Sequence, residues 1–219
     1  MFDVAKRRTI LAAGFCLLQP ARLLAQSTTF RRPLAFEVWR KGHQIGTHTV
    51  SFRGDSKDFA VATDAELLVK IGPVPVFRYH HQASEFWRAG RFVQLESHTT
   101  TNGSEVHVTA VRSADSVTVS TSKGQVLHAP PGACPLTHWN AAVLGGPVIN
   151  PQNGELPHER VTRTLGDVVQ LADGRKIPAT RCTLTGDADL TDWYDGEGVW
   201  TALQAKAPDG SLIDYRRTV

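Results

Sequence analysis

The chain has 219 residues, of which 24 are Lys or Arg and 21 are Asp or Glu, and its formal net charge is +3. Residues 1–25 hold four of the basic residues and one acidic residue, so the rest of the chain keeps 20 of each and is neutral. A neutral chain gives no support for a nucleic-acid-binding surface and no reason to expect attraction to anionic lipid. Its length suits one domain with a sizeable core.

Residues 1–25 are typical of an export signal. The basic stretch from Lys6 to Arg8 precedes the apolar run 9–18, and Ala25 offers a small residue for cleavage before Gln26. The run is only about half the ~20 residues that a membrane-spanning helix needs. The pair Arg7-Arg8 also fits a twin-arginine signal, so both export routes stay open. We predict a periplasmic or secreted protein with no transmembrane segment, in which residues 26–219 form a single β-rich domain.

Alternation of apolar and polar side chains with a period of two dominates the chain after Pro33, which is typical of β-strands. In the segment 61–71, Val61 and Leu67 share one face with Ala65, while Glu66 lies on the other, so one side is buried and one faces water. The strands expected before residue 130 are 36–41, 48–52, 61–71, 76–87, 92–101, 105–112, 117–122 and 125–129.

The strongest hairpin signal is Asn102-Gly103, because both residue types tolerate a positive φ in a two-residue turn. Counted from this turn, His98 and His107 lie opposite each other on the same side of the sheet. That spacing is one that a two-histidine metal site could use. No zinc motif such as H-E-x-x-H or C-x-x-C occurs, however, so we predict no metal site and no cofactor.

The alternation breaks at residues 130–158. Pro130-Pro131-Gly132 stops the preceding strand, and residues 136–144 are the best helix candidate, with Thr137 as the expected N-cap. Residues 145–158 are rich in Gly and Pro and are expected to form a loop. Strands are expected again at residues 160–165, 168–172, 177–186, 199–206 and 211–218.

About a dozen strands with short connections and almost no helix predict an all-β, mainly antiparallel fold. A meandering curved sheet of this kind buries its edges by forming a β-barrel or half-barrel, here with one short helix near residues 136–144. Cys134 and Cys182 either pair as a disulfide or remain buried thiols, and their spacing does not decide between the two.

The stretch DWYDGEGVW (192–200) combines aromatic and acidic residues, as sugar-binding and catalytic sites do. The strand period instead predicts a hairpin, with the turn at residues 195–198 and the acids in water. Trp193 and Tyr194 then face opposite sides of the sheet. No nucleophile elbow, phosphate loop or dinucleotide motif occurs, so we predict no catalytic residue.

Four stretches resemble a family of bacterial exported proteins of unknown function, the domain of unknown function numbered six-one-three-four, which is similar to family three-one-zero-eight. They are FEVWRKGHQIGTHTVSF (36–52), YHHQASEFWRAGRFVQLESHTTTNG (79–103), PLTHWNAAVL (135–144) and DWYDGEGVWTALQAKAPDGSLIDYR (192–216). The resemblance implies an exported β-rich domain. The last stretch is also distantly similar to the periplasmic lipoprotein-carrier fold, in which a curved antiparallel sheet holds acyl chains.

We therefore expect a non-enzymatic envelope protein that binds an apolar or lipid-like small molecule on the concave face of its sheet. Two alternatives stay open: an envelope hydrolase that uses turn carboxylates or histidines, and a structural or assembly partner that uses its sheet edge. The sequence leaves the oligomeric state unknown. The side chains expected to line the ligand site are Trp39, Tyr79, His81, Trp87, Trp139, Asn140 and Trp193.

Overall fold

A computed structural model describes residues 31–218, and the predicted signal peptide, residues 1–25, lies outside this range. Apart from one 3₁₀ helix, the regular secondary structure of the described residues is β-strand. The elements, in chain order, are β1 (Leu34–Arg40), β2 (His43–Gly54), β3 (Asp58–Ile71), β4 (Val74–Arg88), β5 (Arg91–Thr101), β6 (Ser104–Arg112), β7 (Val117–Thr121), β8 (Val126–Ala129), β9 (Cys134–Pro135), the 3₁₀ helix η1 (Ala141–Val143), β10 (Val148–Ile149), β11 (Glu159–Gln170), β12 (Lys176–Gly186), β13 (Leu190–Tyr194), β14 (Trp200–Lys206) and β15 (Leu212–Arg217).

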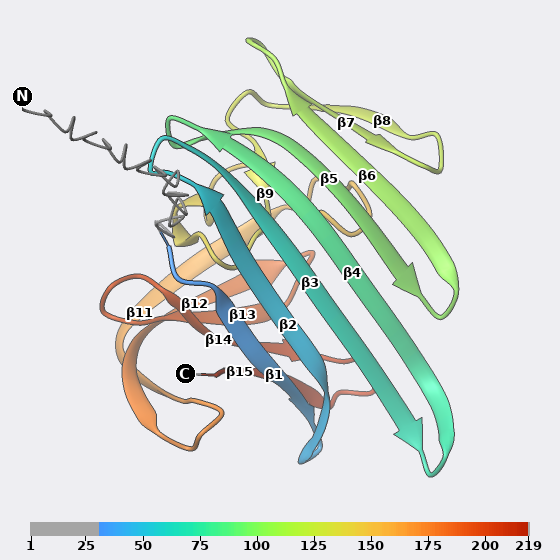
Figure 1. The fold of residues 1–219 in the computed structure, drawn as a ribbon, viewed down its shortest axis with the longest axis vertical. Helices are drawn as coiled ribbons and strands as arrows, with labels where there is room; N and C mark the ends of the chain where they lie inside the picture. Colours follow the sequence, from blue (N-terminus) through green and yellow to red (C-terminus); the bar gives the residue numbers. More distant parts are fainter. Residues whose placement is uncertain (1–30, 219) are drawn as a thin grey trace, which may run out of the picture.

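Thirteen of the strands form one antiparallel sheet in the order β11-β12-β13-β14-β15-β1-β2-β3-β4-β5-β6-β7-β8. In Figure 1 the layer from β1 to β6 curves in front, and β11 to β15 cross behind it. The predicted all-β, mainly antiparallel curved sheet is confirmed. The sheet is not closed, since β11 and β8 are its edges, so the half-barrel is the form observed.

Two-residue turns fix the register of the hairpins. Asn102 and Gly103 have φ values of 49° and 86°, as a tight hairpin turn requires. The turn places Thr101 opposite Ser104 and His98 opposite His107, as the sequence predicts. A slip by one residue would move each side chain to the other face of the sheet, so this turn decides which residues point inward.

The inner face of the curved sheet carries the core. Its most deeply buried side chains include Phe36, Phe92, Leu95, Val108 and Trp200. Alternate residues on the same strands are exposed or half-buried, which is the one-sided pattern expected of an antiparallel sheet with one wet face.

The crossover segment, residues 130–158, links the two halves of the sheet, and in Figure 1 its yellow trace lies between them. The predicted helix at 136–144 is reduced to the single turn η1, and its N-cap is Asn140, not Thr137. At the start of the predicted helix, the backbone N–H of Leu136 instead donates to the carbonyl of Ile149, in line with the short parallel pairing of β9 and β10. The backbone is extended again at Asn140 and at Leu144, so the helical turn is confined to residues 141–143.

Cys134 and Cys182 are free thiols, so the question of a disulfide is answered in favour of unpaired cysteines. Within residues 31–218, no helix combines the length and apolar character needed to cross a membrane.

Candidate functional site

A polar cavity of about 70 Å³ lies inside the half-barrel, between the inner face of the sheet and the crossover segment. We call it the chamber. Its wall combines ionisable and hydroxyl-bearing side chains with aromatic and small apolar ones. The lining residues are His48, Val50, Thr63, Ala65, Tyr79, His81, Ala83, Glu85, Leu136, Thr137, His138, Trp139, Pro151, Gln152, Trp200 and Tyr215.

Two of its histidines, His48 on β2 and His81 on β4, are almost completely buried. Burial, with a smaller effect of the nearby His138, lowers the pKa of His48 to about 3 and that of His81 to about 4. Both imidazoles are therefore neutral near pH 7, and each offers one donor and one acceptor. The Nδ1 atom of His81 lies 2.8 Å from the hydroxyl of Thr99.

The third histidine, His138, comes from the crossover segment and is held by Asp192 on β13. Its Nδ1 atom lies 3.0 Å from Oδ2 of Asp192, whose side chain is fully buried. The other carboxylate oxygen of Asp192 accepts a hydrogen bond of 2.9 Å from the indole N–H of Trp200. The imidazole also stacks on Trp200, with ring centroids 5.1 Å apart. Because Nδ1 is engaged, Nε2 is the atom of His138 left for a ligand in the chamber.

Glu85 on β4 is a second buried carboxyl at the chamber. Its two oxygens accept hydrogen bonds from the indole N–H groups of Trp87, at 2.7 Å, and Trp139, at 3.3 Å. Burial raises the pKa of Glu85 to about 7, although these two hydrogen bonds act in the opposite direction. Glu85 therefore exchanges a proton in the neutral range, which is uncommon for a structural carboxyl.

Aromatic rings along the inner face of β4 lead to the chamber. Phe77 stacks on Tyr79 with centroids 6.4 Å apart, and Tyr79 stacks on His81 at the same distance. Phe77 and Tyr79 are half-buried, whereas His81 is buried, so the row becomes more enclosed toward the chamber. Burial raises the pKa of Tyr79, which keeps its phenol protonated.

The seven side chains expected from the sequence divide into two groups. Tyr79, His81 and Trp139 line the chamber, and Trp87 packs behind it against Trp139, with ring centroids 5.4 Å apart. The others lie elsewhere. Asn140 caps η1, the Trp39 indole donates to Glu37 with Arg216 over its ring, and Trp193 donates to Asp167 on the opposite face from Tyr194.

Four ionisable residues of the site were not predicted: His48, Glu85, His138 and Asp192. Of these, Asp192 corrects an explicit expectation, because it is a buried residue of β13 and not a solvated turn acid. Its position two residues before Tyr194 puts both on the inner face, and this alternation was the available signal. The turn itself is as predicted: Oδ1 of Asp195 accepts from the backbone N–H groups of Glu197 and Val199.

A possible metal-ligand set lies away from the chamber. Within residues 31–218 it consists of His98, Glu105 and His107. The potential ligand atoms of these three side chains all lie within 4.8 Å of one another. These three side chains belong to the outer face of β5 and β6.

Comparison with known proteins agrees with this architecture. A family model described as "Domain of unknown function (DUF6134)" matches residues 36–218, which confirms the resemblance drawn from the sequence. The crystal structure of a β-barrel-like protein of the domain of unknown function DUF1849 from Brucella abortus is similar, with a TM-score of 0.59 at 11% identity over 85% of this chain and 95% of that one. At this identity the likeness concerns the fold alone. No curated protein matches the sequence.

Proposed function

Since this chain belongs to the DUF6134 family, whose description names no activity, we propose from the chamber that it binds a small amphipathic molecule of the cell envelope, with the polar end of that molecule inside. Location in the envelope rests on the export signal predicted at residues 1–25. The observation that carries the proposal is a polar, partly ionisable cavity inside an otherwise apolar core.

A polar cavity in a core is costly unless its groups find partners. In the chamber the neutral imidazoles of His48 and His81 and the Nε2 atom of His138 are available to a ligand. A volume of about 70 Å³ corresponds to roughly two water molecules, whereas pockets for whole small molecules measure about 300–1,000 Å³. The chamber therefore suits one end of a ligand, not an entire acyl chain.

The row of Phe77 and Tyr79 supports an apolar body for the same ligand. These rings continue from His81 along β4 and are half-buried, so they offer a flat apolar surface next to the polar cavity. Aromatic surface of this kind stabilises a bound hydrocarbon by removing its area from water. The lipid-like ligand expected from the sequence is thereby narrowed to one that carries a hydrogen-bonding head group.

The test is native mass spectrometry of the protein purified from its own cells, compared with an Ala83→Leu variant. Ala83 lines the chamber, so the added carbon atoms fill it. Ala62→Leu is the matched control, because Ala62 is an exposed residue on the outer face of β3, where it pairs with Ser84 of β4. We expect a bound mass in the wild type and in Ala62→Leu that is lost in Ala83→Leu. A bare mass in the wild type, or a ligand retained by Ala83→Leu, contradicts the proposal.

Hydrolysis is the second candidate function, and the pairing of His138 with Asp192 favours it. A carboxylate on Nδ1 orients an imidazole so that Nε2 can take a proton from an attacking water. The test is turnover of a panel of chromogenic esters by the wild type and by His138→Asn and Asp192→Asn. Turnover that falls at least about a hundredfold in His138→Asn supports catalysis. Turnover that is equal in all three proteins, or absent throughout the panel, removes it.

A further inference from the structure

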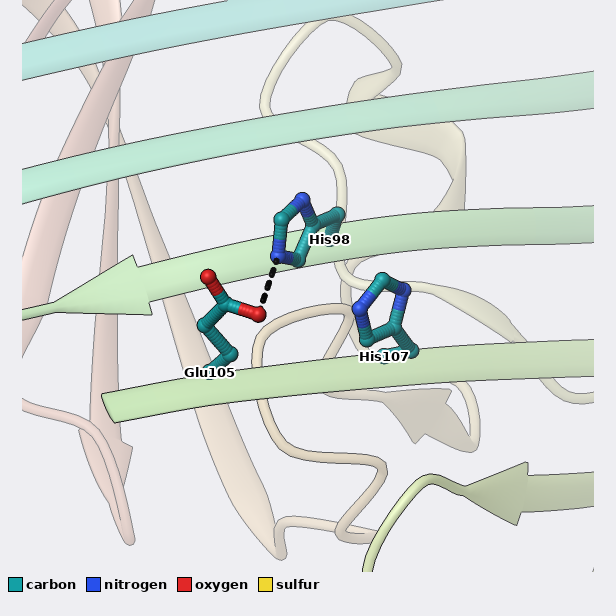
Figure 2. A group of neighbouring side chains, drawn as sticks. All are labelled: His98, Glu105 and His107. Carbon is teal, nitrogen blue, oxygen red and sulfur yellow. Dashed lines mark ion pairs between the residues drawn. The ribbon is translucent and has the colours of Figure 1, made fainter. Parts of the chain in front are cut away.

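Three potential metal ligands lie together on the outer face of the β5–β6 hairpin. His98 is on β5, and Glu105 and His107 are on β6 (Figure 2). The turn at Asn102-Gly103 brings His98 directly opposite His107. Glu105 is two residues from His107 and therefore on the same face of the strand. These three residues, here called the outer triad, lie on the opposite side of the sheet from the chamber.

The geometry of the outer triad is close to that of a metal site. The imidazole rings of His98 and His107 have centroids 4.1 Å apart and an interplanar angle of 10°. Nε2 of His98 lies 3.7 Å from Oε2 of Glu105, the contact drawn as a dashed line in Figure 2. The same Nε2 atom is shielded from solvent and makes no hydrogen bond to any residue of the described chain. A buried ring nitrogen without a hydrogen bond needs a partner, and a metal ion would be one.

We propose that the outer triad binds one divalent late transition-metal ion, for which Zn²⁺ is the probe. Two imidazole nitrogens and one carboxylate oxygen are a donor set that suits Zn²⁺ and its neighbours, whereas Mg²⁺ and Ca²⁺ prefer oxygen ligands. Bonds of about 2.0–2.2 Å place tetrahedral ligand atoms roughly 3.3–3.6 Å apart. Ligand atoms that already lie within 4.8 Å reach this spacing by small side-chain rotations.

The hairpin makes the site rigid on one side and open on the other. The side-chain oxygen of Asn102 accepts a hydrogen bond of 2.8 Å from the backbone N–H of Arg78, which ties the turn to β4. The backbone under the triad is thus fixed before metal arrives. With three protein ligands, the fourth position is left to water or to a group from another molecule, as in zinc sites that are not purely structural.

The experiment is isothermal titration of untagged full-length protein with ZnCl₂ at pH 7.5. We expect one ion per chain at the tightest site. His98→Gln and His107→Gln should each weaken its binding by at least about tenfold, because even an outer-shell change costs about 10–100-fold. Glu105→Gln should weaken it as well, since the amide supplies no charge.

The matched control is His158→Gln. The Nδ1 atom of His158 lies 3.8 Å from Oδ2 of Asp187, so it is an exposed histidine beside a carboxylate without a second imidazole. The His158→Gln variant should bind Zn²⁺ as tightly as the wild type. The far-ultraviolet circular dichroism and unfolding temperature of each variant show that the fold is intact. Titration of ¹⁵N-labelled protein should shift the side-chain resonances of His98 and His107. Absence of a one-to-one site in the wild type, or a tight site that survives the double change His98→Gln/His107→Gln, overturns the proposal.

Discussion

Oδ2 of Asp192 lies 3.0 Å from Nδ1 of His138, and this contact fastens the crossover segment to β13 across 54 residues of sequence. The carboxylate is fully buried, and its second oxygen is bonded to Trp200. A buried charge that is paired in this way is costly to leave without its partner. The contact therefore couples the position of His138 in the chamber to the integrity of the far half of the sheet.

We expect Asp192→Asn to lower the free energy of unfolding by about 2 kcal/mol. The amide has no negative charge for His138 and Trp200 to contact, and its NH₂ group must face one of these two partners. Urea unfolding followed by tryptophan fluorescence measures the change. Asp189→Asn, at an exposed site in the turn before β13, should stay within about 0.5 kcal/mol of the wild type. Equal stability of the two variants would show that the buried contact contributes little.

The buried histidines should make the protein sensitive to acid. The pKa values of His48 and His81 are lowered from 6.5 to about 3 and about 4 in the folded state. Below pH 6.5 the unfolded chain takes up protons that the folded chain cannot, so stability is lost as the pH falls from 6.5 toward 4. Each histidine contributes about 1.4 kcal/mol per pH unit to this slope.

The measurement is urea unfolding at intervals between pH 4.5 and 7. The slope of the unfolding free energy against pH reports how many protons the chain takes up on unfolding. In His48→Gln this number should be smaller than in the wild type by about one proton, whatever the effect of the substitution on absolute stability. His43→Gln, at an exposed position at the start of β2, should leave the slope as it is. An unchanged slope in His48→Gln would mean that this imidazole is protonated inside the folded protein.

Glu85 should act in the opposite sense. Its folded pKa is raised from 4.5 to about 7, so the folded chain keeps a proton that the unfolded chain releases. Its unfavourable effect is absent below about pH 4.5, grows as the pH rises, and reaches about 3 kcal/mol above pH 7. Glu85→Gln removes this titration and keeps an oxygen for Trp87. The stability of the variant relative to wild type should rise by about 3 kcal/mol between pH 4.5 and 8 in urea titrations. No such rise is expected for Glu66→Gln on the exposed face of β3.

Gly154 fixes the crossover segment against β7. Its φ is +78°, and a Cβ atom added there would lie 2.6 Å from Cγ2 of Thr121. Gly154→Ala should therefore destabilise the protein by about 1–3 kcal/mol through both backbone strain and the clash. Gly196→Ala is the control, because a Cβ there meets nothing within 4 Å and φ is not positive. Thermal unfolding distinguishes the two, and equal melting temperatures would contradict the role given to Gly154.

The two cysteines should remain thiols in the purified protein. Burial raises the pKa of both thiols, because it keeps the charged thiolate out of water. Mass spectrometry after iodoacetamide in non-reducing denaturant should show both alkylated. In native buffer Cys134, which is half-buried, should react faster than buried Cys182. A protein in which the two cysteines are oxidised to a disulfide would contradict the two free thiols of the structure.

The strands and their faces were predictable because apolar and polar side chains alternate along the sequence with a period of two. Val61, Ala65 and Leu67 point inward as expected, and Trp193 and Tyr194 face opposite sides. The chamber was predictable only in part. His138 lies in a segment with no periodicity, so nothing in the local sequence indicates its direction. Glu85 and Asp192 are residue types usually found at the surface, and only the strand alternation that they share with Trp87 and Tyr194 indicates that they point inward.

The strand that joins the halves of the sheet is β15, which follows every other described strand in sequence and lies between β14 and β1. Every other pair of neighbouring strands in the large sheet is consecutive in the chain. The pair of β1 and β15 is not, and it places Phe36 opposite Arg217. Hairpins between consecutive strands close short loops and can form early, but the pairing of β1 with β15 must close a loop of nearly all the described residues. We expect the two halves to assemble separately and to dock only when β15 pairs with β1.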